Sequence, residues 1–320
     1  MGQVLNFLVC AKRRLMSLKQ PASDPAAPHA GYLAYGLPIL SGLAFPELRV
    51  RNCRDAPQVR IHTGDVAPEL EGRTGKGALF ETARSRFLLR LDGIARYLVT
   101  DGDQIVIDPA PGTDEDSIRL FLLGSVFGAL LHQRGLLPLH ASAIETARGA
   151  VLFAGASGTG KSTLAGAFYR RGYRVVADEI CALDGDRVRP AVPRLTLWPD
   201  AVEELGLWSD AVRQVRPNIK RFHVPVEPLT AHDPLPVHAI YILSLTNRPD
   251  FAVSRLGGVE TLQALINHTF RRQFIALESG AGYMSRITAA ASTIPISRLV
   301  RSPSRSLRET ADLLERDFTR

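Results

Sequence analysis

Short apolar runs broken by tight-turn residues fill the first third of the chain. Two Asp-Gly pairs, at residues 92–93 and 101–102, separate apolar runs that together extend from residue 84 to residue 108. Asp-Gly tolerates the positive φ angles of hairpin turns, so two tight hairpins are expected. Residues 31–112 are therefore predicted to form a β-rich N-terminal domain that has no catalytic cluster of its own.

A helical pattern follows directly. Either Thr113 or Asp114 can cap a helix whose first turn holds Asp114, Glu115 and Asp116, and the segment is apolar on most sides as far as Gly135. Carboxylates in a first turn cap free N–H groups and face the positive end of the helix dipole. We expect a helix here, buried between two domains because it has no broad polar face.

From residue 136 onward, apolar runs alternate with amphipathic segments, which is the pattern of an α/β domain. We expect strands at residues 136–144, 150–154, 173–183, 238–245 and 294–299, and helices at 161–171, 261–274 and 307–318. The predicted organisation is an extension and linker over 1–30, the β-rich domain over 31–112, and a second domain over 113–320.

Composition narrows the class of protein. Hydrophobic residues make up 45% and charged residues 22%, which excludes disorder over most of the chain. The net charge of +7 fits anionic partners such as nucleotides or acidic peptides, or an ordinary soluble surface. Aromatic residues are only 7%, which disfavours a stacking platform for single-stranded nucleic acid, and we expect no nucleic-acid partner.

Cysteine usage and hydropathy bear on location. Cys10, Cys53 and Cys181 are widely spaced and odd in number, so neither a disulfide framework nor a zinc cluster is expected. The apolar run at 7–11 precedes its basic residues, the reverse of a secretory signal, and the run at 118–131 is too short to span a bilayer. These features predict a cytoplasmic protein without stable membrane insertion.

The strongest chemical signal is a phosphate-binding loop. The pattern G-x-x-x-x-G-K-[ST] is matched in full by Gly155, Ala156, Ser157, Gly158, Thr159, Gly160, Lys161, Ser162 and Thr163. Backbone N–H groups of such a loop and of the following helix N-terminus surround a phosphate, and Lys161 can reach the β- and γ-phosphates. The Ser162 hydroxyl can ligate Mg²⁺. The motif therefore predicts Mg²⁺–ATP binding, against the alternative of a structural Gly-rich turn.

Three further side chains are candidates for chemistry. Asp178 and Glu179 end an apolar strand soon after the loop, where one carboxylate can take a proton while the other holds a metal. A strand-end turn is the structural alternative. His140 lies in an apolar strand before the loop, where a histidine is usually a satisfied core residue.

Together, residues 139–143, 155–163 and 171–179 resemble the catalytic domain of HPr kinase/phosphorylase. The resemblance covers about residues 136 to 300 and implies a PEP-carboxykinase-like P-loop kinase fold. It also implies that Asp178 deprotonates an acceptor serine near His140. Lys161 would cradle phosphate, and Ser162 and Glu179 would be metal ligands.

Some further segments resemble a shorter bacterial group of HPr-kinase-like proteins: residues 35–41, 45–48, 198–200, 220–221 and 239–243. Residues 193–200 stand where the family has a Glu-Ile-Arg-Gly-Leu signature, so Glu203 and Glu204 are the candidates for its metal-binding glutamate. Some members of the shorter group phosphorylate a C-terminal serine of lasso-peptide precursors, which implies the same kind of acceptor here. HPr-type enzymes are hexameric, so the resemblance also implies a homo-oligomer.

The leading interpretation is an ATP-dependent serine kinase acting on a peptide or small protein. The alternatives are a kinase of a small molecule, such as an amino acid or sugar, and a nucleotide-binding regulator without transfer activity. Some basic residues are candidate contacts for phosphate or an acidic peptide, or else surface charges: Arg194, Arg216, Lys220 and Arg221.

Overall fold

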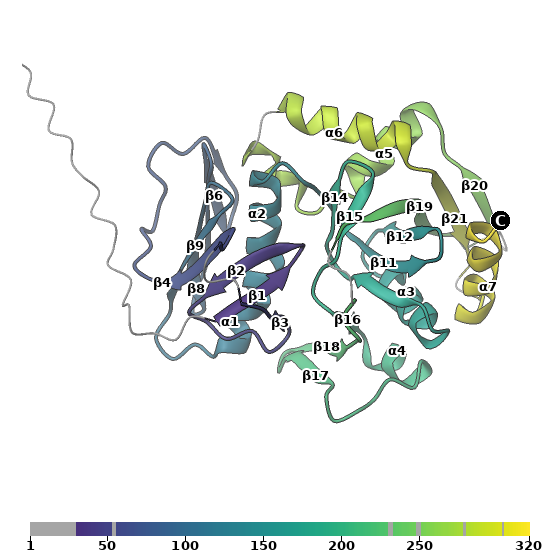
Figure 1. The fold of residues 1–320 in the computed structure, drawn as a ribbon, viewed down its shortest axis with the longest axis horizontal. Helices are drawn as coiled ribbons and strands as arrows, with labels where there is room; N and C mark the ends of the chain where they lie inside the picture. Colours follow the sequence, from purple (N-terminus) through teal and green to yellow (C-terminus); the bar gives the residue numbers. More distant parts are fainter. Residues whose placement is uncertain (1–29, 53–55, 230–232, 248–250, 278–279, 303) are drawn as a thin grey trace, which may run out of the picture.

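The computed structural model describes residues 30–52, 56–229, 233–247, 251–277, 280–302 and 304–320 (Figure 1). The predicted extension, apart from Ala30, and the cysteines Cys10 and Cys53 lie outside these residues. Within them the chain is a mixed α/β protein with two nine-stranded sheets and one three-stranded sheet. Cys181 is a buried free thiol. No helix among the residues described combines the length and apolarity needed to cross a membrane.

The first sheet contains the N-terminal strands in the order β3-β1-β2-β4-β9-β8-β7-β6-β5. Its strands are β1 Ala30–Ala34, β2 Leu37–Ser41, β3 Arg49–Val50, β4 Val59–Thr63, β5 Gly75–Lys76, β6 Phe80–Ala83, β7 Arg86–Leu91, β8 Ala95–Thr100 and β9 Gln104–Pro109. Both predicted hairpins are confirmed, because β7 pairs with β8 and β8 with β9 in antiparallel register. Asp101 and Gly102 have positive φ, as a tight hairpin turn requires.

The helical segment after this sheet has three parts. It consists of α1 Glu115–Phe121, a π-helix at Leu122–Val126 and α2 Phe127–Gln133. The expectation of one regular helix is therefore wrong in its middle turn, because π-type hydrogen bonds interrupt the α-helical ones. The predicted cap is confirmed, since Asp114 Oδ1 accepts from Ser117 N over 2.7 Å.

The burial expected for this segment is also found. Leu122, Phe127 and Leu130 are fully buried in a core shared by the N-terminal sheet and by Ile180 and Ala182 of the second part of the chain. In Figure 1, α2 lies between the first sheet and β14. The two parts of the chain are thus packed through this apolar helical segment.

The second sheet is built around parallel pairing of β12 with β19 and of β19 with β21. Its strands are β10 Leu137–Leu139, β11 Ala141–Thr146, β12 Gly149–Gly155, β13 Arg174–Ala177, β14 Cys181–Asp184, β15 Arg187–Arg189, β19 Leu235–Leu245, β20 Phe251–Arg255 and β21 Ile296–Arg301. Its helices are α3 Lys161–Arg170, α5 Gly258–Asn267, α6 Gly280–Thr293 and α7 Leu307–Phe318.

Alternation along β12 explains the layers. Leu152 contributes to the core under α5 and α6, whereas Val151 and Phe153 contribute to the core under α3 and α7. Successive strand residues point to opposite faces, so a continuously apolar strand is buried on both sides. The sheet is therefore sandwiched between two helical layers, with the phosphate loop at the end of its central strand.

Two predicted strands are each divided in two, and one predicted helix ends early. The strand expected at 136–144 is two strands separated by His140, and that at 173–183 is two strands separated by residues 178–180. The helix expected at 261–274 ends at Asn267, and a 3₁₀ helix follows at Arg272–Leu277. At each strand break a candidate chemical residue leaves the regular ladder, which apolar periodicity alone does not reveal.

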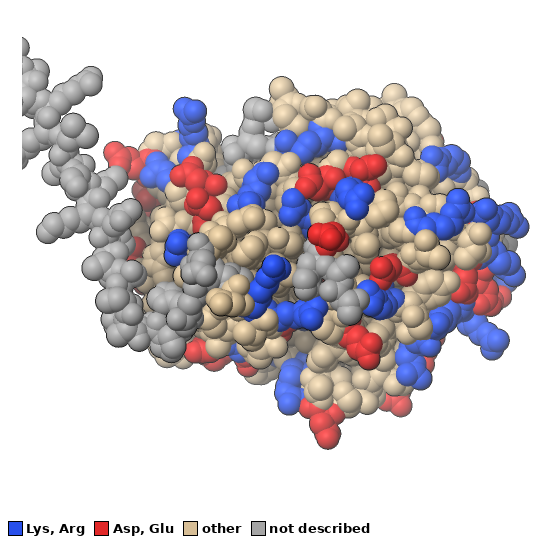
Figure 2. Space-filling view, in the orientation of Figure 1, with Lys and Arg blue, Asp and Glu red and all other residues tan. Residues whose placement is uncertain are grey.

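The third sheet is small and antiparallel, in the order β16-β18-β17. It comprises β16 Arg194–Leu197, β17 Arg213–Arg216 and β18 Ile219–Pro225, and α4 Pro199–Glu204 follows β16. Figure 1 shows this sheet beside α1 and below the phosphate loop's helix α3. Figure 2 shows basic side chains interspersed with acidic ones over the face viewed, so charge of one sign does not dominate that face.

Candidate active site

The phosphate loop lies between β12 and α3. Its glycines have backbone or steric roles: φ is +156° at Gly155 and +89° at Gly160. A Cβ at Gly155 would lie 2.7 Å from Thr159 Oγ1, and one at Gly160 would lie 2.8 Å from Arg301 Nη2. Side chains at these positions would both strain the backbone and fill the loop, which is why the motif requires glycine.

Lys161 reaches back across the loop. Its Nζ donates to Gly155 O and Ala156 O, both over 3.0 Å, and its side chain is almost fully enclosed. Burial lowers the pKa of this ammonium, an effect that the negative charge of Asp178 opposes. The positive charge of Lys161 therefore lies against the carbonyl groups of the loop.

Asp178 is held by three hydrogen bonds. Its Oδ1 accepts from Ser142 Oγ over 2.6 Å and from Ser162 Oγ over 2.8 Å. Its Oδ2 accepts from Thr196 N over 2.7 Å. The structure thus brings the loop serine and the first carboxylate of the acidic pair into direct contact.

Glu179 differs from its neighbour in conformation and in contacts. Its φ of +74° is rare for a residue with a side chain. The side chain makes no hydrogen bond with any residue that the structure describes. Burial, and secondly the charge of Asp178, raise the pKa of this carboxyl.

His140 lies between β10 and β11. Its backbone N–H donates to His268 O over 2.7 Å, and its ring Nδ1 lies 3.2 Å from Glu179 O. Burial, assisted by the charge of Lys161, lowers the pKa of His140 to about 4. The imidazole is accordingly neutral at pH 7 and is fixed against the backbone of Glu179.

A cavity of about 520 Å³ opens in front of these groups. Its lining includes His140, Glu179 and the phosphate-loop residues Ser157, Gly158, Gly160, Lys161, Ser162 and Thr163. Of the acidic pair, Glu179 lines this cavity and Asp178 does not, among the residues that the structure describes. Glu179 is therefore the member of the acidic pair that faces the cavity.

Several lining residues were not singled out by sequence reasoning. Arg301 donates from Nη2 to Thr159 O over 3.1 Å, and Arg305 lines the wall beside Ser306 and Leu307. Arg301 ends β21, more than a hundred residues after the loop, so no local pattern could have indicated it. Ser142, which donates to Asp178, had a usable signal, because it lies two residues after His140 within the strand expected at 136–144.

The candidate basic contacts separate in space. Arg221 lines the cavity and donates from Nη2 to Thr196 O over 3.2 Å. Arg194 lines a different pocket, and the Arg216 guanidinium lies over the Phe121 ring at 5.9 Å. Glu204 lines the phosphate-loop cavity from α4, whereas Glu203 is not among the described lining residues.

The donor set fits Mg²⁺ bound together with a nucleotide. In the described part of the chain, no three His, Cys, Asp or Glu side chains are grouped to hold a metal. The Ser162 hydroxyl and the Asp178 carboxylate already touch, however, and Mg²⁺ is commonly held by one or two such oxygens together with phosphate oxygens and water. Ser162 and Asp178 are thus the residues suited to that ion.

Comparisons with known proteins find structural similarity only at a distance. No protein-family model and no curated protein sequence matches the chain. Among solved structures, the chain is similar to the HPr(Ser) kinase/phosphatase from Coxiella burnetii, at 16% identity over 57% of this chain and 90% of that one, with a TM-score of 0.26. At that distance the function has to be argued from the residues of the site.

Proposed function

We propose that this protein is a Mg²⁺-dependent phosphotransferase that moves the γ-phosphoryl group of ATP to a serine hydroxyl of a peptide or small protein. The observation that carries the proposal is the contact between Ser162 and Asp178 at the mouth of a complete phosphate loop. In ATP-hydrolysing and ATP-transferring proteins, a loop hydroxyl and a strand-end carboxylate share the metal that accompanies the nucleotide.

The phosphate-loop residues supply binding and charge. Ser162 and Asp178 would hold Mg²⁺, which neutralises charge on the β- and γ-phosphates. Lys161 would exchange its contacts with Gly155 O and Ala156 O for phosphate oxygens, because a charged acceptor binds an ammonium more strongly than a carbonyl does. Arg221 and Arg301 lie at the cavity wall and add positive charge where the transferred group would pass.

The roles of the two carboxylates are proposed from their contacts. Family resemblance assigns proton transfer to Asp178 and metal binding to Glu179. The hydrogen bonds of Asp178 to Ser142, Ser162 and Thr196 N support the opposite division. Asp178 would anchor the metal site, and Glu179, which lines the cavity without a hydrogen-bond partner among the described residues, would accept the proton.

In the proposed transfer, the acceptor hydroxyl oxygen bonds to the γ-phosphorus, the bond from that phosphorus to the β–γ bridging oxygen breaks, and ADP leaves. The hydroxyl proton moves to Glu179. The hydrogen-bonding interaction between His140 Nδ1 and Glu179 O positions the backbone that carries this base.

The acceptor and the location belong to the same proposal. Resemblance to the HPr-kinase-like group favours a peptide with a terminal serine, as in lasso-peptide precursors, with the 31–112 domain contributing to its recognition. We place the reaction in the cytoplasm, where ATP is available and a buried free thiol such as Cys181 stays reduced.

The test uses the full chain with radiolabelled ATP and three acceptor pools: short serine peptides, free amino acids and sugars, and no acceptor. Mg²⁺-dependent labelling of the peptide pool, absent in Lys161→Ala, is expected. Labelling confined to the small-molecule pool would replace the peptide acceptor by a small molecule. ATP binding without any transfer would replace the kinase by a nucleotide-binding regulator.

A further inference from the structure

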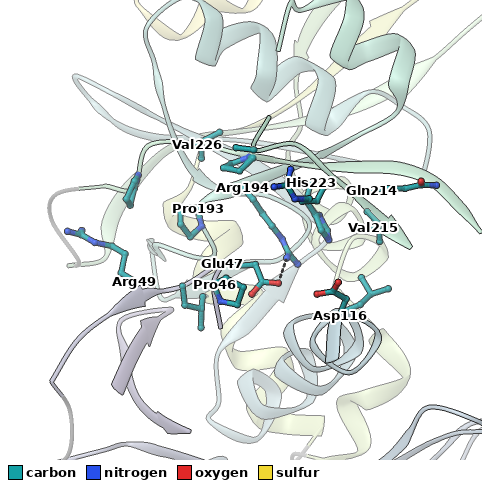
Figure 3. Close-up of a pocket in the computed structure, with 16 residues that line it drawn as sticks. Pro46, Glu47, Arg49, Asp116, Pro193, Arg194, Gln214, Val215, His223 and Val226 are labelled. Carbon is teal, nitrogen blue, oxygen red and sulfur yellow. Dashed lines mark ion pairs between the residues drawn. The ribbon is translucent and has the colours of Figure 1, made fainter. Parts of the chain in front are cut away.

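A second pocket, larger than the phosphate-loop cavity, lies between the N-terminal part of the chain and the three-stranded sheet (Figure 3). Its volume is about 660 Å³, within the range of about 300–1,000 Å³ typical of ligand sites. One wall is formed by residues 46–49 together with Asp116 and Leu120 of α1. The other wall comes from β16, β17 and β18 and from residues that flank them.

Arg194 is the central polar group of this pocket. Its side chain is only 11% exposed, and its ion-pair partner Glu47 is 3.7 Å away, beyond hydrogen-bond distance. The guanidinium makes no hydrogen bond with any residue that the structure describes. A guanidinium has five N–H donors and cannot give up its charge, so a buried one without bonds is suited to an anionic ligand.

Glu47 adds an acceptor beside this cation. Its Oε1 is shared between Arg194 and Arg119, at 3.7 and 3.4 Å. Its Oε2 is buried and has no hydrogen-bond partner among the described residues. A ligand that offers both a carboxylate and an N–H group would satisfy Arg194 and Glu47 together, and a peptide carries both.

The rest of the lining favours a peptide segment with an acidic group. Three arginines line the pocket, Arg49, Arg194 and Arg213, against two acids, Glu47 and Asp116. Both acids already pair with Arg119. The walls between the charges are apolar and rigid, formed by Pro46, Leu48, Leu120, Pro193, Val215, Pro225, Val226 and Pro228.

Strand β16 connects this pocket to the candidate active site. Arg194 begins the strand, and Thr196, two residues further, donates its N–H to Asp178. Two residues of strand span about 7 Å. A chain anchored on Arg194 can therefore extend into the phosphate-loop cavity within a few residues.

We propose, on the basis of the kinase function proposed above, that this pocket binds an acidic segment of the acceptor peptide, with a ligand carboxylate on Arg194. The apolar walls would hold a neighbouring side chain, and the anchored segment would place its serine in front of Glu179.

The test measures peptide binding without turnover. An array of short synthetic serine peptides, in matched pairs that differ only in Glu or Gln, is probed with the labelled full-length protein. The Glu member of each binding pair should bind about ten-fold more tightly, since a charge-assisted bond to a guanidinium is lost with Gln. Arg194→Gln should abolish this difference, and Arg255→Gln, an exposed arginine on β20, should keep it.

A second variant tests the pocket independently, in case Arg194→Gln does not fold. Ala211→Trp adds bulk at an exposed position in the pocket lining and should weaken binding of all the peptides, whereas Ala252→Trp, exposed on β20, should not. Equal binding of Glu and Gln peptides, or a preference that survives in Arg194→Gln, would overturn the proposal. Competition by free glutamate at peptide concentrations would overturn the peptide assignment.

Binding of a fluorescent ATP analogue, measured on every variant, separates the two proposals. If ATP binding is retained but Glu peptides are not preferred over Gln peptides, the pocket proposal alone is overturned. If the wild-type protein binds no ATP analogue, the proposed kinase function is overturned, whatever the array shows.

Discussion

Ser162 Oγ and Asp178 Oδ1 lie 2.8 Å apart and share a hydrogen bond. Ser162 lies in the first turn of α3 and Asp178 directly follows β13, so the rest of α3, a turn and β13 separate them along the chain. A second hydroxyl, that of Ser142, binds the same carboxylate oxygen over 2.6 Å. Asp178 is consequently the more constrained side chain of the acidic pair.

Lys161→Ala should abolish phosphoryl transfer while the protein stays folded. The substitution removes the charge at the centre of the loop, and loss of one preorganised group commonly costs about 10²–10³-fold in rate. Transfer is measured with labelled ATP and folding by circular dichroism. Lys76→Ala, an exposed lysine of the N-terminal sheet, is the matched control. Near-normal transfer in Lys161→Ala would contradict the phosphate-loop assignment.

Asp178→Asn and Ser162→Ala should each raise the Mg²⁺ concentration needed for half-maximal transfer, by about 10-fold or more. The two side chains act through one contact, so the double variant should lose less than the sum of both single effects. The measurement is a Mg²⁺ titration at saturating ATP. If Asp178→Asn leaves the Mg²⁺ requirement unchanged and lowers only turnover, Asp178 is the proton acceptor after all.

Glu179→Gln should lower turnover by about 10²–10⁴-fold, the usual cost of losing a general base, with little change in ATP affinity or in the Mg²⁺ requirement. The reason is that Glu179 faces the cavity without hydrogen-bonding to Ser162. Glu260→Gln, an exposed glutamate on α5, is the matched control and should remain active. Normal turnover in Glu179→Gln would exclude it as the base.

Glu81 of the N-terminal sheet gives a prediction about stability and pH. It is fully enclosed, and it accepts from Leu70 N, Arg73 Nη1 and Arg90 Nη1 over 2.8, 2.8 and 2.9 Å. The hydrogen bond from Leu70 N and those from the two arginines lower its pKa from 4.5 to about 2. Because the folded pKa is the lower one, Glu81 stabilises the fold above pH 4.5, and this contribution is lost as pH falls toward 2.

Glu81→Gln should therefore be less stable than the wild type at pH 7, and the difference should shrink between pH 4.5 and 2. Urea unfolding followed by circular dichroism measures both proteins at each pH. Glu69→Gln is the matched control, since that carboxylate is 67% exposed and lies 3.9 Å from Arg73. A stability difference that grows on acidification would show that the charge of Glu81 is not the cause.

Features set by near neighbours could be predicted from the sequence. The two Asp-Gly hairpins, the cap at Asp114, helix 307–318 and the phosphate loop depend on backbone angles, capping groups and local apolar spacing. These are properties of a few consecutive residues, and a chain that contains them adopts them with little help from the rest of the fold. The acidic pair at 178–179 was found for the same reason, because it directly follows an apolar strand.

Long-range packing decided what those residues face. Asp178 and Glu179 are adjacent in the chain, yet Asp178 bonds Ser162 while Glu179, at a left-handed φ, lines the cavity. Arg301 reaches the phosphate loop only because β21 joins the sheet beside β19. Hydrogen-bond direction and burial depend on which distant segments pack together, and no window of consecutive residues contains that information. The pairing of Arg194 with Glu47 across two parts of the chain was decided by the same packing.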